Sequence, residues 1–189
     1  EYDYLSIGFS AQFSTDTNKN NRSYLYGVAA AFDKIDPEGG VPTAFGQMQP
    51  AGVAQPRGAD SETKNVVDAL FGITQVIDRY SLMQLNYSVS YASGYLSDPF
   101  KVISVLDTNG RPEVLDAAAN LPHVVFENRP DTRLKHSFYG QYKRQVRCGD
   151  IIDTSYRLMI DDWGITSHTL DFRYRFKLND ASYLRPHLR

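Results

Sequence analysis

The chain lacks the features that identify several common protein classes. Cys148 is the only cysteine among 189 residues, so neither a disulfide framework nor a thiolate metal cluster can form within the chain. The longest apolar runs, such as residues 28–32, fall far short of the ~20 residues that a membrane-spanning helix needs. The formal net charge of -2 gives no reason to expect nucleic acid as a partner. No signal-peptide pattern opens the chain, so we expect an exported protein here in its mature or trimmed form.

Motifs that mark enzymes and cofactor sites are also missing. The sequence contains no Gly-x-Ser-x-Gly, His-Glu-x-x-His, P-loop or dinucleotide fingerprint. Histidines stand only at positions 123, 136, 168 and 187, which is too dispersed to predict a metal site. His136 and Ser137 are neighbours, but adjacent residues of a strand point to opposite faces and cannot form a catalytic dyad. We therefore expect no enzyme, no metal and no cofactor.

Aromatic residues are abundant, and they alternate with polar ones. Phe, Tyr and Trp make up 13% of the chain, with thirteen Tyr and ten Phe against one Trp. In the first segment one face is formed by Leu5, Ile7, Phe9, Ala11 and Phe13. Polar and small residues occupy the positions between them, which is the period-2 pattern of a strand with two different faces. A barrel that hides its apolar residues at every second position is compatible with the mean hydropathy of -0.41.

The same pattern predicts about eight strands, at residues 1–13, 23–32, 65–77, 83–91, 134–143, 152–160, 169–178 and 184–188. Most are longer than the ~5–6 residues of ordinary strands and match the ~9–11 that cross a bilayer. Short connections alternate with longer ones, which comprise loops at about 34–64 and 92–131 and a medium loop at 161–168. Within the second long loop, residues 101–106 and 123–127 should be extended. We predict an all-β fold, an antiparallel transmembrane β-barrel that forms one domain over residues 1–189 and is incomplete at both ends.

A soluble lipocalin-like barrel or β-sandwich is the alternative, because its strands alternate as well. Such a fold buries its apolar face over a packed core and leaves the other face to solvent. Tyrosines near strand ends, at Tyr24, Tyr91, Tyr142 and Tyr174, instead favour an aromatic girdle at a membrane interface.

Several stretches resemble a known family. They are GYLSDPFKV at 94–102, ENRPDTR at 127–133, YR at 156–157 with DDWGI at 161–165 and SHTL at 167–170, and the ending YLRPHLR at 183–189. In this order and spacing, from Asp3 to the last residue, the sequence is similar to the domain of unknown function 3570 family. The resemblance implies a β-barrel in the outer membrane of Gram-negative bacteria and no established activity. Family members are typically longer, which implies that this chain is part of a larger barrel; a closed eight-stranded barrel is the alternative.

The polar rows predict a lumen with two different halves. The first four strands contribute small or neutral residues, whereas the later strands contribute a basic wall of Lys135, Lys143, Arg157, Arg173, Arg175, Lys177, Arg185 and His187. Only Asp153 and Asp171 oppose these cations on the same rows. One interpretation is a wall that favours anions, as charged rings do in pores. The other is a structural ladder in which Arg157 and Arg173 pair with Asp153 and Asp171 across neighbouring strands.

A second group of charged residues lies at or beyond the rim of the long loops. This loop-rim cluster is Asp98, Lys101, Glu127, Arg129, Asp131, Arg133, Asp161, Asp162, Trp163 and His168. Carboxylates and guanidiniums at this density suit bidentate pairs that fix loops against each other. The alternative is a Ca²⁺ site at Asp161, Asp162 and a loop carbonyl. Trp163 should anchor the interface or pack under the loop, and Cys148 should lie in a tight turn at 147–150, where its thiol could take a lipid or a disulfide partner.

Two functional hypotheses follow. The first is an outer-membrane channel or passive transporter with a partly basic lumen, passing an unidentified small solute or anion. The second is a plugged or closed barrel that scaffolds a periplasmic or surface partner. Both place the protein in the bacterial outer membrane, in contact with its lipid and with other envelope proteins.

Overall fold

The computed structural model describes residues 3–50, 52–116, 121–146, 149–179 and 181–189, and all regular elements within them are β-strands. No helix among these residues is long and apolar enough to cross a membrane. The all-β, antiparallel class predicted from alternation is confirmed.

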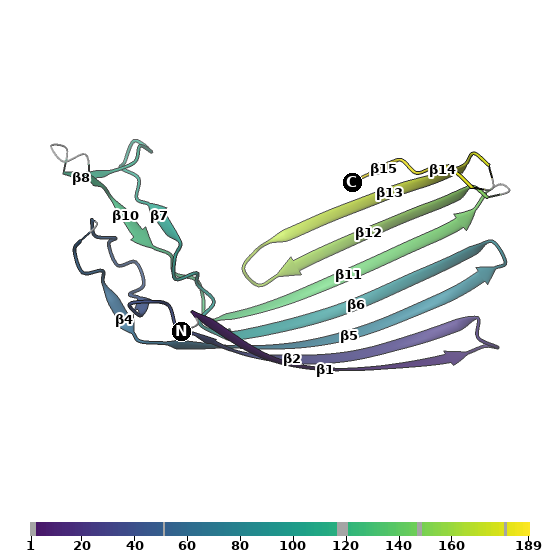
Figure 1. The fold of residues 1–189 in the computed structure, drawn as a ribbon, viewed down its shortest axis with the longest axis horizontal. Helices are drawn as coiled ribbons and strands as arrows, with labels where there is room; N and C mark the ends of the chain where they lie inside the picture. Colours follow the sequence, from purple (N-terminus) through teal and green to yellow (C-terminus); the bar gives the residue numbers. More distant parts are fainter. Residues whose placement is uncertain (1–2, 51, 117–120, 147–148, 180) are drawn as a thin grey trace. The chain divides into compact units, whose positions relative to one another are not determined.

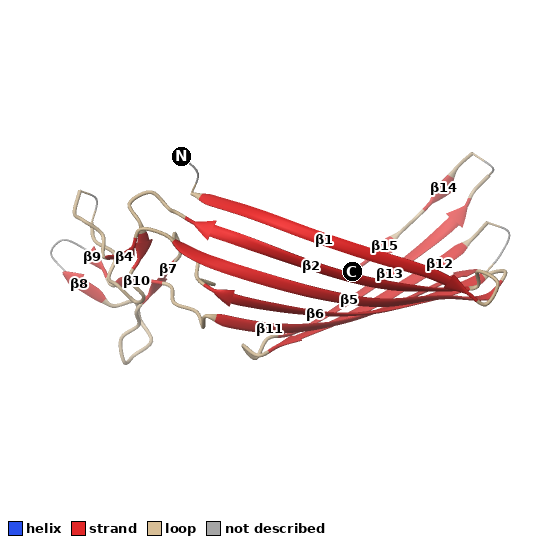
Figure 2. Ribbon diagram, turned by 90° about the horizontal axis from the view of Figure 1, so that it is seen from below, coloured by secondary structure: helices blue, strands red, loops and turns tan. Residues whose placement is uncertain are grey.

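Seven long strands form the main sheet. They are β1 (Tyr4–Thr17), β2 (Arg22–Ile35), β5 (Glu62–Asp78), β6 (Ser81–Gly94), β11 (Thr132–Gln145), β12 (Ile151–Asp161) and β13 (Thr166–Lys177). Each lies beside the next in chain order (Figure 1), and Figure 2 shows them as one layer of strands. All seven were predicted, and all seven are at least as long as a bilayer requires.

The predicted eighth strand is interrupted. It consists of β14 (Tyr183–Leu184) and β15 (His187–Leu188), both of which pair with β13. Pro186 lies between them, and its carbonyl accepts a hydrogen bond from the Tyr174 amide at 3.2 Å. Proline has no amide hydrogen to donate in return, so the ladder cannot continue through it.

The sheet is open among the described residues. β1 stands at one end of the strand order, and β14 and β15 stand at the other, with no pairing between the two ends. β1 therefore presents a fourteen-residue edge whose outer backbone groups have no strand partner.

The connections follow the predicted pattern with one correction. The links after β1, β5, β11 and β13 are short, and those after β2 and β6 are long. The predicted medium loop at 161–168 is wrong: β12 runs to Asp161 and β13 begins at Thr166. Oδ1 of Asp161 accepts the amides of Trp163 at 3.1 Å and Ile165 at 2.8 Å, and Gly164 takes a φ of +79°, so a tight turn suffices. Residues 147–148, with Cys148, lie outside the described residues.

The chain divides into two compact units. Unit 1 comprises residues 1–8, 31–66 and 92–132, and unit 2 comprises residues 9–30, 67–91 and 133–189. Unit 1 contains the two predicted long loops, and they are structured. Three small antiparallel pairs lie in them: β3 (Val41–Pro42) with β4 (Arg57–Ala59), β7 (Val102–Ser104) with β10 (Val124–Phe126), and β8 (Val114–Asp116) with β9 (Leu121–Pro122). The extended pieces predicted at 101–106 and 123–127 are thus confirmed.

Unit 1 has a small hydrophobic core. The buried apolar side chains among the described residues are Ile35, Val41, Ala92, Val125 and Phe126, and all of them belong to this unit. The guanidinium of Arg57 lies 5.6 Å from the centre of the Phe126 ring. The long loops therefore bury apolar residues as a soluble domain does.

Unit 2 has two chemically different faces, as the alternation predicts. On the apolar face, the Tyr87 ring lies 4.9 Å from Phe138, and the Tyr26 ring lies 5.4 Å from Phe71. Phe138 is paired with Leu158 in the β11–β12 ladder. On the polar face, a Cβ at Gly72 would meet the side chain of Asn86, and Gly27 lies against Leu70.

The apolar face of unit 2 is the more exposed one. Phe9, Val28 and Leu170 are 66%, 61% and 62% accessible, and no described residue covers them. Along β5, exposed residues such as Val67 and Phe71 alternate with less exposed ones such as Asp68 and Leu70. The whole chain exposes 13007 Å², against about 9,100 Å² for a compact protein of its mass. This pattern is the reverse of the one expected for a sandwich with a packed core.

The close approach at Gly94 generates a stability prediction. Gly94 has a φ of +103°, and a Cβ there would collide with the carbonyl oxygen of Thr63 in the same unit. Gly110 has a similar φ of +75° but open space around it, so Gly110→Ala is the matched control. Both glycines have a positive φ, so alanine strains the backbone at either position. Gly94→Ala should nevertheless lower the free energy of unfolding in urea by about 1–3 kcal/mol more than Gly110→Ala does, because its Cβ also forces the backbone to shift. Equal losses would contradict the close contact.

Candidate functional site

The strand registers place four ionisable residues in one row across the polar face of unit 2. Lys143 is paired with Asp153, Asp153 with Arg173, and Arg173 with His187. Directly paired residues of a sheet point to the same side, so β11, β12, β13 and β15 each contribute one member.

The same parity places most of the predicted basic wall on this face. Lys135, Lys143, Arg157, Arg173, Arg175, Lys177 and His187 share it with Asp153 and Asp171. Arg185 is the exception because it lies in the break between β14 and β15, outside any strand. Seven of the eight residues predicted as a basic wall therefore share one face of the sheet, where the cations outnumber the carboxylates.

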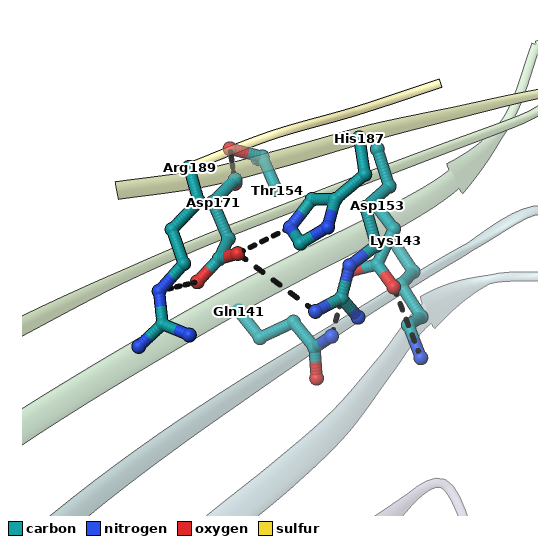
Figure 3. A network of polar contacts seen from close by, with 8 residues as sticks. Gln141, Lys143, Asp153, Thr154, Asp171, His187 and Arg189 are labelled. Carbon is teal, nitrogen blue, oxygen red and sulfur yellow. Dashed lines mark hydrogen bonds and ion pairs between the residues drawn. The ribbon is translucent and has the colours of Figure 1, made fainter. Parts of the chain in front are cut away.

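Asp171 is the centre of the densest polar network (Figure 3). Its Oδ1 lies 2.5 Å from Nε2 of His187 and 3.8 Å from Nη2 of Arg173, and its Oδ2 lies 4.0 Å from Nε of Arg189. Arg189 was missed at the sequence level, although it follows His187 by two positions and so shares its parity. Three basic side chains thus surround one carboxylate, and His187 is the one at hydrogen-bond distance.

Asp153 forms a second, smaller network (Figure 3). Nε2 of Gln141 donates to its Oδ1 at 2.6 Å, and Nζ of Lys143 lies 3.4 Å from its Oδ2. The ion pairs differ from the predicted cross-strand ladder: Arg173 pairs with Asp171 along its own strand, and Arg157 pairs with neither carboxylate. Gln141 was missed because a neutral amide gave no charge signal.

Two arginines of this face lie on tyrosine rings. The guanidinium of Arg157 lies 5.6 Å from the ring centre of Tyr139, and that of Arg175 lies 4.4 Å from the ring centre of Tyr183. Within the described part of the chain, no ion pair involves Arg157, Arg175, Lys135 or Arg185. This face consequently carries a positive charge that its own carboxylates do not neutralise.

The predicted loop-rim cluster is divided between the two units. Asp98, Lys101, Glu127, Arg129 and Asp131 belong to unit 1, and Arg133, Asp161, Asp162, Trp163 and His168 belong to unit 2. Each half is described on its own below.

In unit 1, Glu127 holds the cluster together. It accepts Nη2 of Arg129 at 2.8 Å and lies 3.1 Å from Nζ of Lys101, while the Asp98 amide points to its Oε2 at 3.5 Å. Burial raises the pKa of Glu127, but these donors outweigh it and hold the pKa below the ordinary value. The carboxylate is thus kept ionised as a structural tie. The cluster extends to Ser97, a buried residue missed at the sequence level, whose Oγ accepts the Arg129 amide at 2.8 Å.

The two remaining acidic residues of this half act locally. Asp98 accepts the Phe100 amide at 3.0 Å through Oδ1, which caps the turn that follows it. Asp131 contributes its backbone carbonyl, which accepts the Gly94 amide at 2.8 Å.

In unit 2, Arg133 and Asp161 form an ion pair at the turn after β12. Nε and Nη2 of Arg133 approach Oδ2 of Asp161 at 2.9 and 2.5 Å, and the Asp161 side chain has no exposed surface. The guanidinium also lies 4.5 Å from the centre of the Trp163 ring, so Trp163 packs under Arg133 at the turn. Asp162 accepts the Leu134 amide at 3.0 Å through Oδ1.

The calcium alternative gains no support from this geometry. Both oxygens of Asp161 already accept hydrogen bonds, from Arg133 and from the amides of the turn. Across the described residues, no three His, Cys, Asp or Glu side chains gather in a way that could hold a metal ion.

His168 is placed differently from its prediction. It lies in β13, paired with Leu158, because the turn after β12 is shorter than expected. Its Nδ1 lies 2.7 Å from the hydroxyl of Tyr156 on the apolar face, and Nδ1 of His136 lies 2.8 Å from the hydroxyl of Tyr87 on the same face. Each histidine thereby pairs its polar atom with that of a tyrosine.

A further network in unit 1 was missed because β2 and β5 extend beyond their predicted ends. Asp33 is buried, with Oδ1 accepting Oγ of Ser6 at 2.5 Å and Oδ2 lying 2.9 Å from Nζ of Lys64. The same ammonium group donates to the hydroxyl of Tyr4 at 3.1 Å. The alternation of faces along the sequence could have revealed this network. Asp33 falls on the same face of β2 as Gly27, and Lys64 falls on the same face of β5 as Asp68.

The position of Trp163 makes the Arg133–Asp161 pair measurable. Because Trp163 is the only tryptophan, the intrinsic emission reports this turn alone. Removing the guanidinium in Arg133→Ala should uncover the ring, shift its emission to longer wavelength and raise its quenching by acrylamide. Lys143→Ala, on the same strand and face but bound to Asp153, should change neither. Unaltered emission in Arg133→Ala would refute the stacked arrangement.

The comparisons with known proteins place the chain in a family but give it no activity. The model of the family described as protein of unknown function (DUF3570) matches residues 1–189, the full length of the chain. Comparison with curated proteins and with solved structures gave no significant match. The chain therefore belongs to the DUF3570 family of proteins of unknown function.

Proposed function

We propose that this chain forms a large part of an outer-membrane β-barrel of Gram-negative bacteria, acting as a channel or passive transporter with a partly basic lumen. The observation that carries the proposal is the reversed exposure of unit 2. Large apolar side chains such as Val28 and Leu170 are exposed, whereas the residues on either side of each in the strand are less accessible. Lipid is a medium that stabilises such a face, since transmembrane barrels direct apolar residues outward and polar ones inward.

The length of the apolar rows supports the same proposal. On β2 the row runs from Tyr24 to Phe32 and ends at the exposed Lys34. On β5 it runs from Val67 to Ile77, interrupted only by Gln75. Both stretches match the ~9–11 residues that a tilted strand needs to cross the hydrocarbon layer.

Tyrosine hydroxyl groups near the ends of the apolar rows have hydrogen-bond partners. Nη1 of Arg22 lies 3.5 Å from the hydroxyl of Tyr24, and the hydroxyl of Tyr174 donates to Asp150 at 3.2 Å. Both groups stand at the short-turn ends of their strands. This arrangement fits an interfacial girdle, in which the ring faces lipid and its hydroxyl reaches a polar layer.

In lipid, the backbone N–H and C=O groups on the outer edge of β1 would need a strand partner, because no water is present to form hydrogen bonds with them. The proposed barrel therefore requires β1 to pair with β13–β15 or with further strands. The proposal assigns lipid and the small solute as contacts and includes no catalytic residue, metal or cofactor.

A plugged barrel that scaffolds an envelope partner is the second candidate. The observation that favours it is the packed unit 1, whose long loops have their own core around Val41 and Phe126. Rigid loops with exposed apolar residues such as Phe45 and Phe100 suit a binding surface better than disordered loops do.

Neighbouring residues on β2 test whether the apolar face meets lipid. Val28 lies in the middle of the apolar row, and Ala29 is the next residue on the polar face. In a bilayer, Val28→Arg should lower the free energy of unfolding by about 2–4 kcal/mol, whereas Ala29→Arg should have a much smaller effect. In water the exposed Val28 would tolerate arginine, so equal effects of the two variants in liposomes would refute the membrane assignment.

Conductance distinguishes the two candidates. The full-length protein in planar bilayers should give discrete ion currents if it is a channel. Absence of current, together with a stable partner copurified from the envelope, would replace the channel by the scaffold.

A further inference from the structure

The carboxylates of the polar face of unit 2 concentrate on a few of its cations. Asp171 is shared by His187, Arg173 and Arg189, and Asp153 binds Lys143. Asp161 binds Arg133 at the turn. Each of these carboxylates thus has a basic partner, whereas Lys135, Arg157 and Arg175 on this face, and Arg185 in the break between β14 and β15, make no ion pair within the described residues.

Two of these four cations, Arg157 and Arg175, lie over tyrosine rings that orient them for binding. Arg157 lies over Tyr139 and Arg175 over Tyr183, so an aromatic face orients each guanidinium without neutralising it. Both arginines are exposed. A stacked guanidinium keeps its N–H groups available at its edge, and this planar fork matches the two oxygens of a carboxylate or phosphate.

The two stacked arginines flank the paired network. Arg157 is opposite Thr169 on β13, and Arg175 is six positions further along that strand. At ~3.3 Å per residue, the two backbone positions are about 20 Å apart along the strand. The ion pair of Asp171 and Arg173 lies between them on β13. The surface therefore has one oriented arginine on either side of this ion pair.

We propose that Arg157 and Arg175 are the specificity-determining residues of this face, and that they bind solutes carrying a carboxylate or phosphate group. This inference rests on the proposed function, in which the polar face lines the lumen. It adds to that function a substrate class and a mechanism of selection. A guanidinium fork favours anions that present two oxygens to it over a spherical anion of equal charge.

The first experiment measures charge selectivity. In a KCl gradient across a planar bilayer, the full-length protein should give a reversal potential of anion preference. The double variant Arg157→Gln/Arg175→Gln should move that potential towards zero. Lys19→Gln, which removes a charge in the turn between β1 and β2, should leave it unchanged.

The second experiment separates orientation from charge. Inorganic phosphate and succinate are each titrated into the protein in liposomes or detergent, by calorimetry. Arg157→Lys keeps the charge without the fork, and Tyr139→Leu keeps the arginine without its platform. Both should weaken binding of phosphate and succinate about tenfold, the scale of one charge-assisted hydrogen bond. Tyr139→Phe keeps the ring and should bind as the unmodified protein does.

The outcomes distinguish this inference from the proposed function. Conductance with cation preference, or binding unaffected by Arg157→Lys and Tyr139→Leu, would overturn the inference while the channel stands. Binding that depends on Arg157 and Tyr139 in a protein without conductance would support the inference and overturn the channel. Binding of only one of the two probes would support the site and restrict it to that chemistry.

Discussion

Direct strand pairing with a two-residue side-chain period is the constraint on which the rest of this structure depends. Once β11, β12 and β13 pair in register, every residue of one parity lies on one side, and the sequence decides what each side meets. A shift by one residue would place Phe138 and Leu170 among the charges of the other face. The separation of the apolar rows from the ionic rows therefore fixes the register more strongly than any single contact does.

That separation also explains why much of the structure was predictable and where prediction stopped. Seven strands and the composition of both faces followed from alternation, because it is a local signal. Pairing of charges did not: Asp171 takes Arg173 from its own strand, and Arg157 stacks on Tyr139, because long side chains choose among several neighbours at similar distance. The turn after β12 was overestimated because its compactness depends on backbone hydrogen bonds to Asp161. Asp33 and Lys64 were missed because the strand ends carry a weaker apolar signal than the strand centres.

The polar face uses its charges in two ways. Where a carboxylate is present, basic side chains gather around it, as at Asp171, and its negative charge offsets part of theirs. Where only a tyrosine is present, as for Arg157 and Arg175, the cation is oriented but its charge is retained. A surface built from both kinds combines a fixed centre with sites that remain able to bind an anion. Neither composition nor net charge distinguishes these two uses, since both contain the same basic residues.

The buried apolar side chains of the described residues all lie in unit 1, although β1, β2, β5 and β6 run through both units. In unit 1 the apolar residues Ile35 and Val125 are buried, and the Asp33–Lys64 pair is withdrawn from solvent. In unit 2 the apolar residues of the same strands are among the most exposed of the chain. One solvent does not favour both arrangements, because water penalises the exposed apolar rows and rewards the buried core. Under the proposed function, a change of medium along the strands would account for both, and the hydrocarbon layer would end on β2 between Phe32 and Lys34.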